Sequence, residues 1–317
     1  MAKLSAAGTH VWSKRFGGTG VDIAYAVTTD GSSNILMTGY FGYFGSAVDF
    51  GGGLLASAGN SDVFLVKLAS TGAHVWSKGF GGTGLDMGYA LATNRTTGDV
   101  AVTGYFQNTA GFGGANITSA GNADIFLAEY SAAGAHMWSK GLGGASDDHG
   151  RGIVIDSLGD VVMTGDFYGN VDFGGGILPN TGGADIVLAK YGSTGTHVWS
   201  RRFGTGLGFG DVASGLAVDA GDNLVLTGSI LGAIDFGGGG LTANGSYDIF
   251  LAKLAPNASH LWSRRYGKLY DDHGNAVAVD RAGRISLVGD FYQGVDFGGG
   301  LLSSPGNTDA CVAEFGP

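Results

Sequence analysis

The sequence predicts an all-β fold in which five repeated units form one domain over residues 1–317. The first observation is a refrain, His-x-Trp-Ser followed by Lys or Arg, which recurs at intervals of 61 to 64 residues. A fixed period of this length is typical of repeat architectures whose units share one core. The second is the presence of 63 glycines and only 4 prolines, which indicates many tight turns and little helix. The refrain begins at His10, His74, His136, His197 and His260.

Each repeat reads as four short strands. In the third repeat, residues 150–156, 161–167, 185–191 and 197–203 are alternating or β-branched segments that turn residues separate. Four such strands in an antiparallel meander form one blade of a β-propeller, so the predicted fold is a single five-bladed β-propeller with four antiparallel strands per blade. The repeats are expected at approximately 10–73, 74–135, 136–196, 197–259 and 260–317, the last being completed by 1–9.

The first strand of each blade carries small residues on one face and mostly large residues on the other. Sheets that pack face to face around an axis crowd most at their inner edge, so this strand is assigned to that edge. The small positions are Ala24 and Ala26, Gly88 and Ala90, Gly150 and Gly152, Ala213 and Gly215, and Gly274 and Ala276.

The two ends of the sequence are complementary. Residues 2–4 match the tail of a third strand, and 10–16 supply a fourth strand, whereas 309–315 form a third strand that no fourth strand follows. We therefore expect the N-terminal strand to close the last blade, because a sealed ring leaves no open strand edge. The alternative, a run taken from a longer array, would leave an unpaired strand at each end.

Six motifs recur in the repeats, namely HVWSKRFGGTG, DDHG, AVAVD, VTG-x-F, VDFGGG and DIFLAKY. They resemble those of the bacterial β-propeller repeat family called SBBP, and the resemblance covers essentially all five repeats. It implies propellers found mostly in secreted or surface-exposed bacterial proteins, so the parent protein is expected outside the cell or on its surface, although this chain starts without a signal peptide. It implies no shared catalytic activity and no ligand.

Composition and motifs exclude several function classes. The net charge of −10 repels phosphate backbones, so no nucleic acid is expected as a partner. No apolar run is long enough for a membrane span, and no nucleophile elbow or phosphate-binding loop is found. Cys311 is the single cysteine and is interpreted as a small buried hydrophobe. We expect a monomer that needs no cofactor and whose partner is an unknown protein or carbohydrate.

An aspartate precedes or opens the inner strand of every repeat. In a five-fold ring these carboxylates would lie at one mouth of the axial channel, where they could bind Ca²⁺ or another ligand. The alternative is that each caps its own turn, because one aspartate per blade does not supply the several oxygens of a dedicated calcium site. These candidates are Asp22, Asp86, Asp148, Asp211 and Asp272.

A second recurrent acid opens the third strand and is interpreted as a turn residue without a ligand. Its copies are Asp62, Asp124, Asp185, Asp248 and Asp309.

Only the third and fifth repeats add histidine to this pattern. His149 is expected to act with Asp166, and His273 with Asp290, since Asp with His can bind a metal or act as a general base. These four residues are ligand-binding candidates, and no residue is assigned as catalytic. The alternative is drift at an exposed rim.

The expected function is a non-enzymatic binding or display scaffold that engages a multivalent ligand through repeated weak pockets, so that avidity raises affinity. Two alternatives remain open: a purely structural spacer, and a hydrolase or lyase that uses Asp and His at the channel mouth. Equal sites in all blades would favour binding, and a unique acid–histidine cluster would favour catalysis. The five refrain tryptophans are interpreted as packing residues that fill the wedge between blades rather than as sugar-stacking surfaces.

Overall fold

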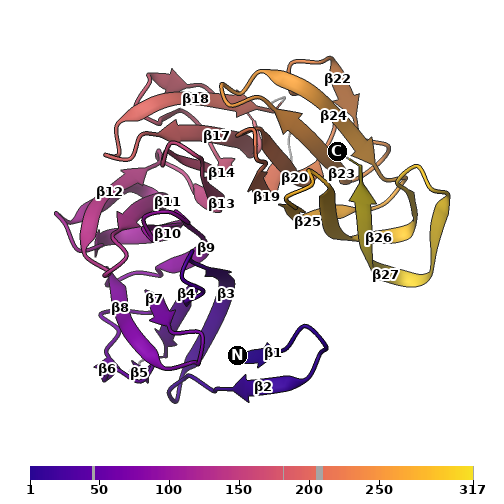
Figure 1. Ribbon diagram of the computed structural model, residues 1–317. Helices are drawn as coiled ribbons and strands as arrows, with labels where there is room; N and C mark the ends of the chain where they lie inside the picture. Colours follow the sequence, from indigo (N-terminus) through magenta and orange to yellow (C-terminus); the bar gives the residue numbers. More distant parts are fainter. Residues whose placement is uncertain (45–46, 181, 205–209, 317) are drawn as a thin grey trace. The chain divides into compact units, whose positions relative to one another are not determined.

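The computed structural model describes residues 1–44, 47–180, 182–204 and 210–316, and its described secondary structure consists of β-strands. By contacts the chain divides into two compact units, Met1–Leu142 and Gly143–Pro317, which are described separately. Within each unit the strands form antiparallel meanders of the propeller type (Figure 1). The expectation of one domain over 1–317 stays a prediction.

The first unit contains a short N-terminal hairpin and two four-stranded blades. The hairpin joins β1 (Ala2–Leu4) to β2 (His10–Ser13). The first blade has the order β3-β4-β7-β8 and the second the order β9-β10-β11-β12, and a short pairing of β8 with β10 connects them. The strands of the first blade are β3 (Val21–Thr29), β4 (Ile35–Tyr43), β7 (Asp62–Leu68) and β8 (His74–Gly82). Those of the second are β9 (Met87–Thr93), β10 (Val100–Gly111), β11 (Ile117–Tyr130) and β12 (His136–Leu142).

The second unit contains two four-stranded blades and a sheet of three described strands. The third blade is β13 (His149–Ile155), β14 (Val161–Phe167), β17 (Asp185–Tyr191) and β18 (His197–Phe203). The fourth blade is β19 (Val212–Val218), β20 (Leu224–Ile230), β23 (Asp248–Leu254) and β24 (His260–Tyr266). The fifth sheet is β25 (His273–Val279), β26 (Ile285–Asp296) and β27 (Leu301–Phe315).

The four strands expected in the third repeat are confirmed, with only the first displaced by one residue. The Gly-rich stretch between the second and third strands forms additional small hairpins, which the sequence analysis did not predict. In the second and fifth repeats the second and third strands extend into this region instead. The separate hairpins are β5 (Val48–Asp49) with β6 (Leu54–Leu55), β15 (Val171–Asp172) with β16 (Ile177–Leu178), and β21 (Ala233–Asp235) with β22 (Gly240–Thr242).

The small residues of the inner strands lie against neighbouring blades, but the prediction that they share one face is wrong. A Cβ added to Gly274 would meet the preceding fourth blade, whereas one added to Gly215 would meet Val277 of the following sheet, because a bulge residue between the two small positions turns them to opposite faces. In the second unit β13 contacts β19 and β19 contacts β25 (Figure 1). A Cβ atom added to Gly274 would lie 2.3 Å from Oγ1 of Thr227 in the fourth blade, and one added to Gly88 would lie 2.4 Å from Oγ1 of Thr38 in the first. Such distances are far below van der Waals contact, so a side chain added at either glycine would displace the threonine.

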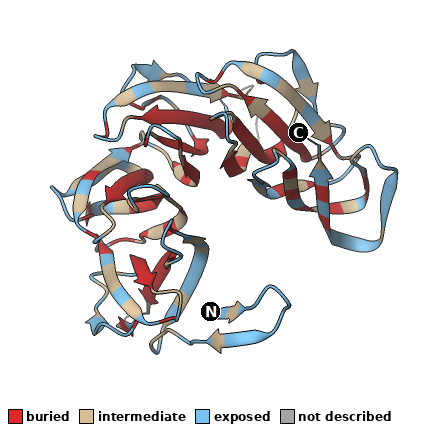
Figure 2. Ribbon diagram, in the orientation of Figure 1, coloured by how far each residue is buried: buried red, intermediate tan, exposed pale blue. Residues whose placement is uncertain are grey.

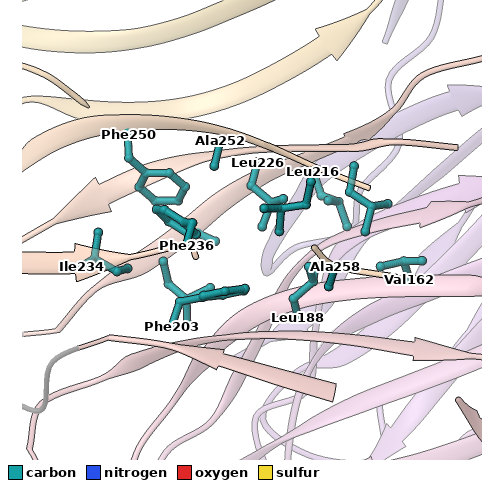
Figure 3. Packing of buried hydrophobic residues seen from close by; sticks show 14 of the residues in the cluster. Val162, Leu188, Phe203, Leu216, Leu226, Ile234, Phe236, Phe250, Ala252 and Ala258 are labelled. Atoms are coloured by element: carbon teal, nitrogen blue, oxygen red, sulfur yellow. The ribbon is translucent and has the colours of Figure 1, made fainter. Parts of the chain in front are cut away.

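The hydrophobic core lies between consecutive blades and is built from their middle strands (Figure 2). Between the third and fourth blades, Val162 and Leu188 pack in one cluster with Leu226, Phe236 and Phe250 (Figure 3). A threonine in the second strand of the first four repeats also lies in this layer and donates its hydroxyl to a third-strand carbonyl 2.7 or 2.8 Å away. The fifth repeat has Val288 at that position.

The refrain residues pack and hydrogen-bond as predicted. The half-buried Trp76 donates its indole N–H to the carbonyl of Ala132, 3.1 Å away in a turn of the second blade. Nε2 of His74 lies 3.0 Å from Oγ of Ser77 within its own strand, and the same pair recurs in three further repeats. Because these groups are engaged in packing and hydrogen bonds, they do not form a surface for stacking sugars.

Replacing Gly274 with valine tests the crowding of the inner edge. We expect Gly274→Val to lower the free energy of unfolding by about 1–3 kcal/mol, because the new side chain would displace Thr227 and its buried hydrogen bond. Urea denaturation followed by tryptophan fluorescence measures the change. Gly299→Val, at an open position where no atom lies within 4 Å of an added Cβ, is the matched control. Equal stability of the two variants would contradict the assignment.

Candidate functional site

The aspartate before each inner strand holds two backbone segments of its blade. In the third blade, one oxygen of Asp148 accepts a hydrogen bond from the N–H of Gly144 at 2.7 Å, and the other accepts one from the N–H of Tyr168 at 2.9 Å. Asp22, Asp86 and Asp272 make the same pair of bonds, to the residues four positions before and twenty or twenty-one after. For Asp211 the bond to Leu231 is described, and the preceding donor position lies outside the described residues.

These bonds support the capping interpretation. Asp86, Asp148 and Asp272 are completely buried, and both of their oxygens accept hydrogen bonds from backbone N–H groups of their own loops and strands. Within the described part of the chain, no group of three or more acidic, histidine or cysteine side chains could hold a metal ion. The ring of ligands around a cation expected from sequence stays a prediction.

The second recurrent acid also caps a turn, and it lies beside the first. Asp62 accepts a hydrogen bond from the N–H of Ala58 at 2.7 Å. A Cβ added to Gly81 would lie 2.5 Å from Oδ1 of Asp62 and 2.6 Å from Oδ2 of Asp86, so both oxygens face the same glycine. Gly81 has a backbone φ of 155°, a conformation that glycine adopts readily and other residues adopt only at an energetic cost. The two carboxylates therefore meet at the junction of the first and second blades.

The same acid pair recurs between the fourth and fifth repeats, but with a cation. Asp248 and Asp272 flank Gly267 in the same way, and there Arg265 forms an ion pair with Asp248. In the first blade, Gly79 occupies the position that Arg265 occupies in the fourth blade. The Asp62–Asp86 pair thus lacks the guanidinium that accompanies its counterpart, and Oδ1 of Asp62 is buried without a hydrogen-bond partner among the described residues.

Burial makes both carboxyls of the first pair weak acids. Loss of solvation raises the pKa of Asp62 to about 6. Loss of solvation also raises the pKa of Asp86 to about 7, with a smaller contribution from the nearby charge of Asp62. Because the folded state binds these protons more tightly than the unfolded chain does, their contribution to stability is present at acid pH and is lost as pH rises through the folded pKa values.

We therefore expect the free energy of unfolding to fall between about pH 4 and pH 7, by on the order of 2 kcal/mol for one such carboxyl. Asp62→Asn should flatten this decline, since its amide carries no charge and can donate a hydrogen bond to Asp86. Urea denaturation at pH 4, 5.5, 7 and 8 measures the slope. The control is Asp49→Asn, because Asp49 is exposed, caps a glycine turn and has a lowered pKa. An unchanged slope in Asp62→Asn would refute the assignment.

The histidine–aspartate pairs expected in the third and fifth repeats are brought together. Nδ1 of His149 lies 3.0 Å from Oδ2 of Asp166, and Nδ1 of His273 lies 3.1 Å from Oδ2 of Asp290. Asp166 is 2% exposed, and its other oxygen pairs with Arg151. Burial opposes ionisation of the Asp166 carboxyl, but hydrogen bonds from His149 and Arg151 and the positive charge of Arg151 hold its pKa below the usual value.

Each pair lies at a β-bulge that all five repeats share. A residue at the start of the inner strand, which is the third residue of β3 and the first residue of β9, β13, β19 and β25, pairs with a residue of the second strand. The inner-strand residue two positions later is the unpaired bulge residue. We call these three residues the inner-edge triplet. The triplets are Ile23, Tyr40 and Tyr25; Met87, Tyr105 and Tyr89; His149, Asp166 and Arg151; Val212, Ser229 and Ser214; and His273, Asp290 and Asn275.

The triplets of the first unit form a tyrosine cluster that the sequence analysis missed. The ring of Tyr25 lies 6.0 Å from that of Tyr40 and 5.0 Å from that of Tyr89, which lies 5.6 Å from Tyr105. Tyr25 is 48% exposed, whereas Tyr40 and Tyr105 are buried. The available signal was the shared position: Tyr25 and Tyr89 stand two residues after Ile23 and Met87, as Arg151 does after His149.

The arrangement defines what the inner edge can do chemically. Because Nδ1 of each histidine is engaged with a carboxylate, Nε2 lies on the opposite side of the ring, where an imidazole can donate or accept a hydrogen bond. The carboxylate fixes the ring, as it does for histidines that bind ligands or act as bases. Cys311 adds no nucleophile, since it is buried and loss of solvation raises its pKa to about 11.

Comparisons with known proteins agree with the repeat. The profile of the SBBP family, described as a β-propeller repeat, matches residues 11–40, which confirms the resemblance. The regulatory protein FlaEY of Caulobacter vibrioides is 27% identical over 155 residues. The match covers 46% of this chain and 16% of that protein, so the chain spans far less than two thirds of this relative.

Solved structures are similar only at low identity. A protein of unknown function from Bacteroides caccae is 10% identical with a TM-score of 0.41, over 80% of this chain and 69% of that one. A glucose dehydrogenase is 12% identical with a TM-score of 0.40, over 91% and 86%. The Pan2 WD40 domain of Neurospora crassa is 10% identical with a TM-score of 0.30, over 83% and 85%. Across the described ranges, no helix has the length and apolar character needed to cross a membrane.

Proposed function

We propose that this chain is a non-enzymatic binding or display scaffold whose ligand contacts the inner-edge triplets, within a protein that acts outside the cell or on its surface. One observation carries the proposal. The residues that build the bulge and its turns recur from repeat to repeat, whereas the triplet residues held at the bulge change from aromatic to charged to small.

This division is typical of repeat proteins that recognise ligands, in which constant positions maintain the fold and variable positions on one surface determine specificity. The constant positions have structural partners, such as the backbone bonds of Asp148 and the buried hydroxyl bond of Thr164. Changes within the triplet leave those partners intact. A spacer would have no need of the buried Asp166, which orients two partly exposed side chains.

The triplets also reduce the number of related binding sites from the five expected from sequence. The histidine–aspartate pair is present in the third and fifth repeats, so it is neither equal in all five nor unique. Avidity would then arise from two related sites rather than from five equivalent ones. The same pair is the feature that a hydrolase or lyase would use, and the experiment has to separate the two functions.

The test compares the chain with the double variant His149→Ala/His273→Ala on arrays of glycans and peptides, and in parallel with chromogenic ester and glycoside substrates. We expect saturable binding that the double variant loses, and no turnover. Val212→Ala/Ser229→Ala, at the same positions of the fourth repeat, is the matched control and should bind as the unaltered chain does. Turnover that disappears in the double variant would overturn the proposal in favour of an enzyme.

The proposed architecture is a closed ring of five blades. In the fifth sheet, Val288 and Val312 are 40% and 72% exposed, although their counterparts Thr227 and Leu251 in the fourth blade are fully buried. In the first unit, a hollow of about 310 Å³ is lined by residues including Ala24, Ala26, Met37 and Phe64. In a closed ring, the exposed apolar face of the fifth sheet and the apolar hollow of the first unit would cover each other. These complementary surfaces support the proposal.

The N-terminal hairpin affects how the fifth sheet could pair with β2 to close the ring. Lys3 and Ala2 pair with Trp12 and Ser13, in the register in which Lys253 and Ala252 pair with Trp262 and Ser263. The strand β1 therefore occupies on β2 the place that residues 313–315 would take. Pairing of β27 with β2 through Phe315 would therefore displace β1.

Closure is tested with the cysteine that the chain already contains. By the register of Phe250 with Arg265, Cys311 would pair with Arg15, and paired residues have Cα separations compatible with a disulfide. We expect Arg15→Cys to form an intramolecular disulfide under mild oxidation, detected by mass spectrometry of non-reduced peptides. Arg15→Cys/Cys311→Ser is the control. Thiols that remain free in the folded variant would contradict a closed ring.

A further inference from the structure

We infer that the third and fifth repeats each carry a subsite for a neutral saccharide, built from the inner-edge triplet and the tyrosine two residues after its aspartate. The subsites are His149, Arg151, Asp166 and Tyr168, and His273, Asn275, Asp290 and Tyr292. The inference rests on the proposed binding function and specifies its ligand class.

The two subsites share one hydrogen-bonding plan. In each, one oxygen of the aspartate carboxylate contacts the histidine, and the other accepts a hydrogen bond from the bulge residue. The bulge residue is Arg151 beside Asp166, and it is Asn275 beside Asp290, at 2.7 Å. The carboxylate thereby orients an imidazole and a second donor group side by side. The histidine side chains are 22% and 38% exposed, so a ligand at the inner edge can reach them.

A tyrosine stands two residues after the aspartate of each pair. The N–H groups of Tyr168 and Tyr292 donate to Asp148 and Asp272 at 2.9 Å, so the capping aspartates position these tyrosines. Tyr168 is 36% exposed, and the ring of Tyr292 lies 4.7 Å from that of Tyr270. The ring of Tyr247, which belongs to the fourth repeat, also lies 5.8 Å from that of His273. Tyrosine offers a rigid apolar face with a polar tip, which suits the C–H faces and hydroxyls of a sugar ring.

The difference between the subsites indicates that the ligand is neutral. Arg151 carries a positive charge, whereas Asn275 at the same position carries none, so a ligand that both subsites recognise cannot depend on a charge there. Asp147 and Asp271 precede the capping aspartates in both repeats and would repel an anion. Hydroxyl groups both donate and accept hydrogen bonds, and therefore match an imidazole, an amide or guanidinium, and a carboxylate together.

The fourth repeat provides an internal contrast. Its residues at the four positions are Val212, Ser214, Ser229 and Leu231, which lack the histidine, the carboxylate and the aromatic ring. The inference therefore assigns it no subsite, although its inner strand lies in the same unit between the other two. An oligosaccharide that engages both subsites would gain avidity without contacts to the fourth triplet.

The experiment uses the full chain and immobilised neutral oligosaccharides, namely gluco-, galacto- and manno-oligosaccharides, with uronic-acid and sulfated glycans and unmodified peptides as comparison probes. We expect saturable binding to at least one neutral series. His149→Ala and His273→Ala should each weaken apparent affinity about tenfold or more through loss of avidity, and the double variant should not bind. Val212→Ala/Ser229→Ala should leave binding unchanged, and thermal melting should show that all variants fold.

Grafting provides a second measurement. Val212→His/Ser214→Asn/Ser229→Asp/Leu231→Tyr copies the fifth subsite into the fourth repeat and should raise affinity for the same oligosaccharide. Binding only to anionic glycans or to peptides would overturn the saccharide inference and leave the proposed binding function standing. No saturable binding to any probe class would overturn both.

Discussion

The rest of each blade depends on the hydrogen bonds of the aspartate before its inner strand. The inner strand has a loop on one side of its start and a bulge on the other, and neither is stabilised by the regular ladder. Asp148 joins them by accepting one N–H from the loop at Gly144 and one from the end of the second strand at Tyr168. Because the carboxylate is buried, the loss of either bond would leave an unsatisfied polar group in the interior. This constraint fixes where the triplet side chains stand.

The same constraint allows the triplet to vary. At the bulge the chain backbones approach so closely that only glycine fits: a Cβ on Gly165 would lie 2.0 Å from the carbonyl oxygen of His149, and Gly289 has the same relation to His273. The side chains of His149 and Asp166 stand on either side of this contact and take no part in it. A repeat can therefore carry tyrosines, serines or a histidine–aspartate pair at these positions without altering the blade, which is the property a recognition surface requires.

The buried aspartates have different neighbours at different blade junctions. Asp248 has Arg265 as a partner, whereas Asp62 has Asp86 as a neighbour and Gly79 in place of an arginine. Gly79 itself is crowded, because a Cβ there would lie 3.1 Å from the ring of Phe41. At the junction of the first and second blades, a glycine packed against an aromatic ring therefore stands where the fourth blade has a guanidinium. The two carboxyls at this junction contribute most to stability when they are protonated. Buried acids of this kind couple the stability of one junction to pH without any role in binding.

The sequence by itself determined the strands of the repeat and the pairing of His149 with Asp166, because these follow from periodicity and from distances along one or two adjacent strands. It did not predict the tyrosine cluster, since Tyr25 and Tyr89 belong to different blades and meet only when β3 packs beside β9. Nor did it show that Asp62 and Asp86, each interpreted alone as a turn residue or a ligand, face one glycine. Those groupings were decided by tertiary structure, because burial and contact between blades depend on how twisted sheets pack, and no spacing along the chain records that geometry.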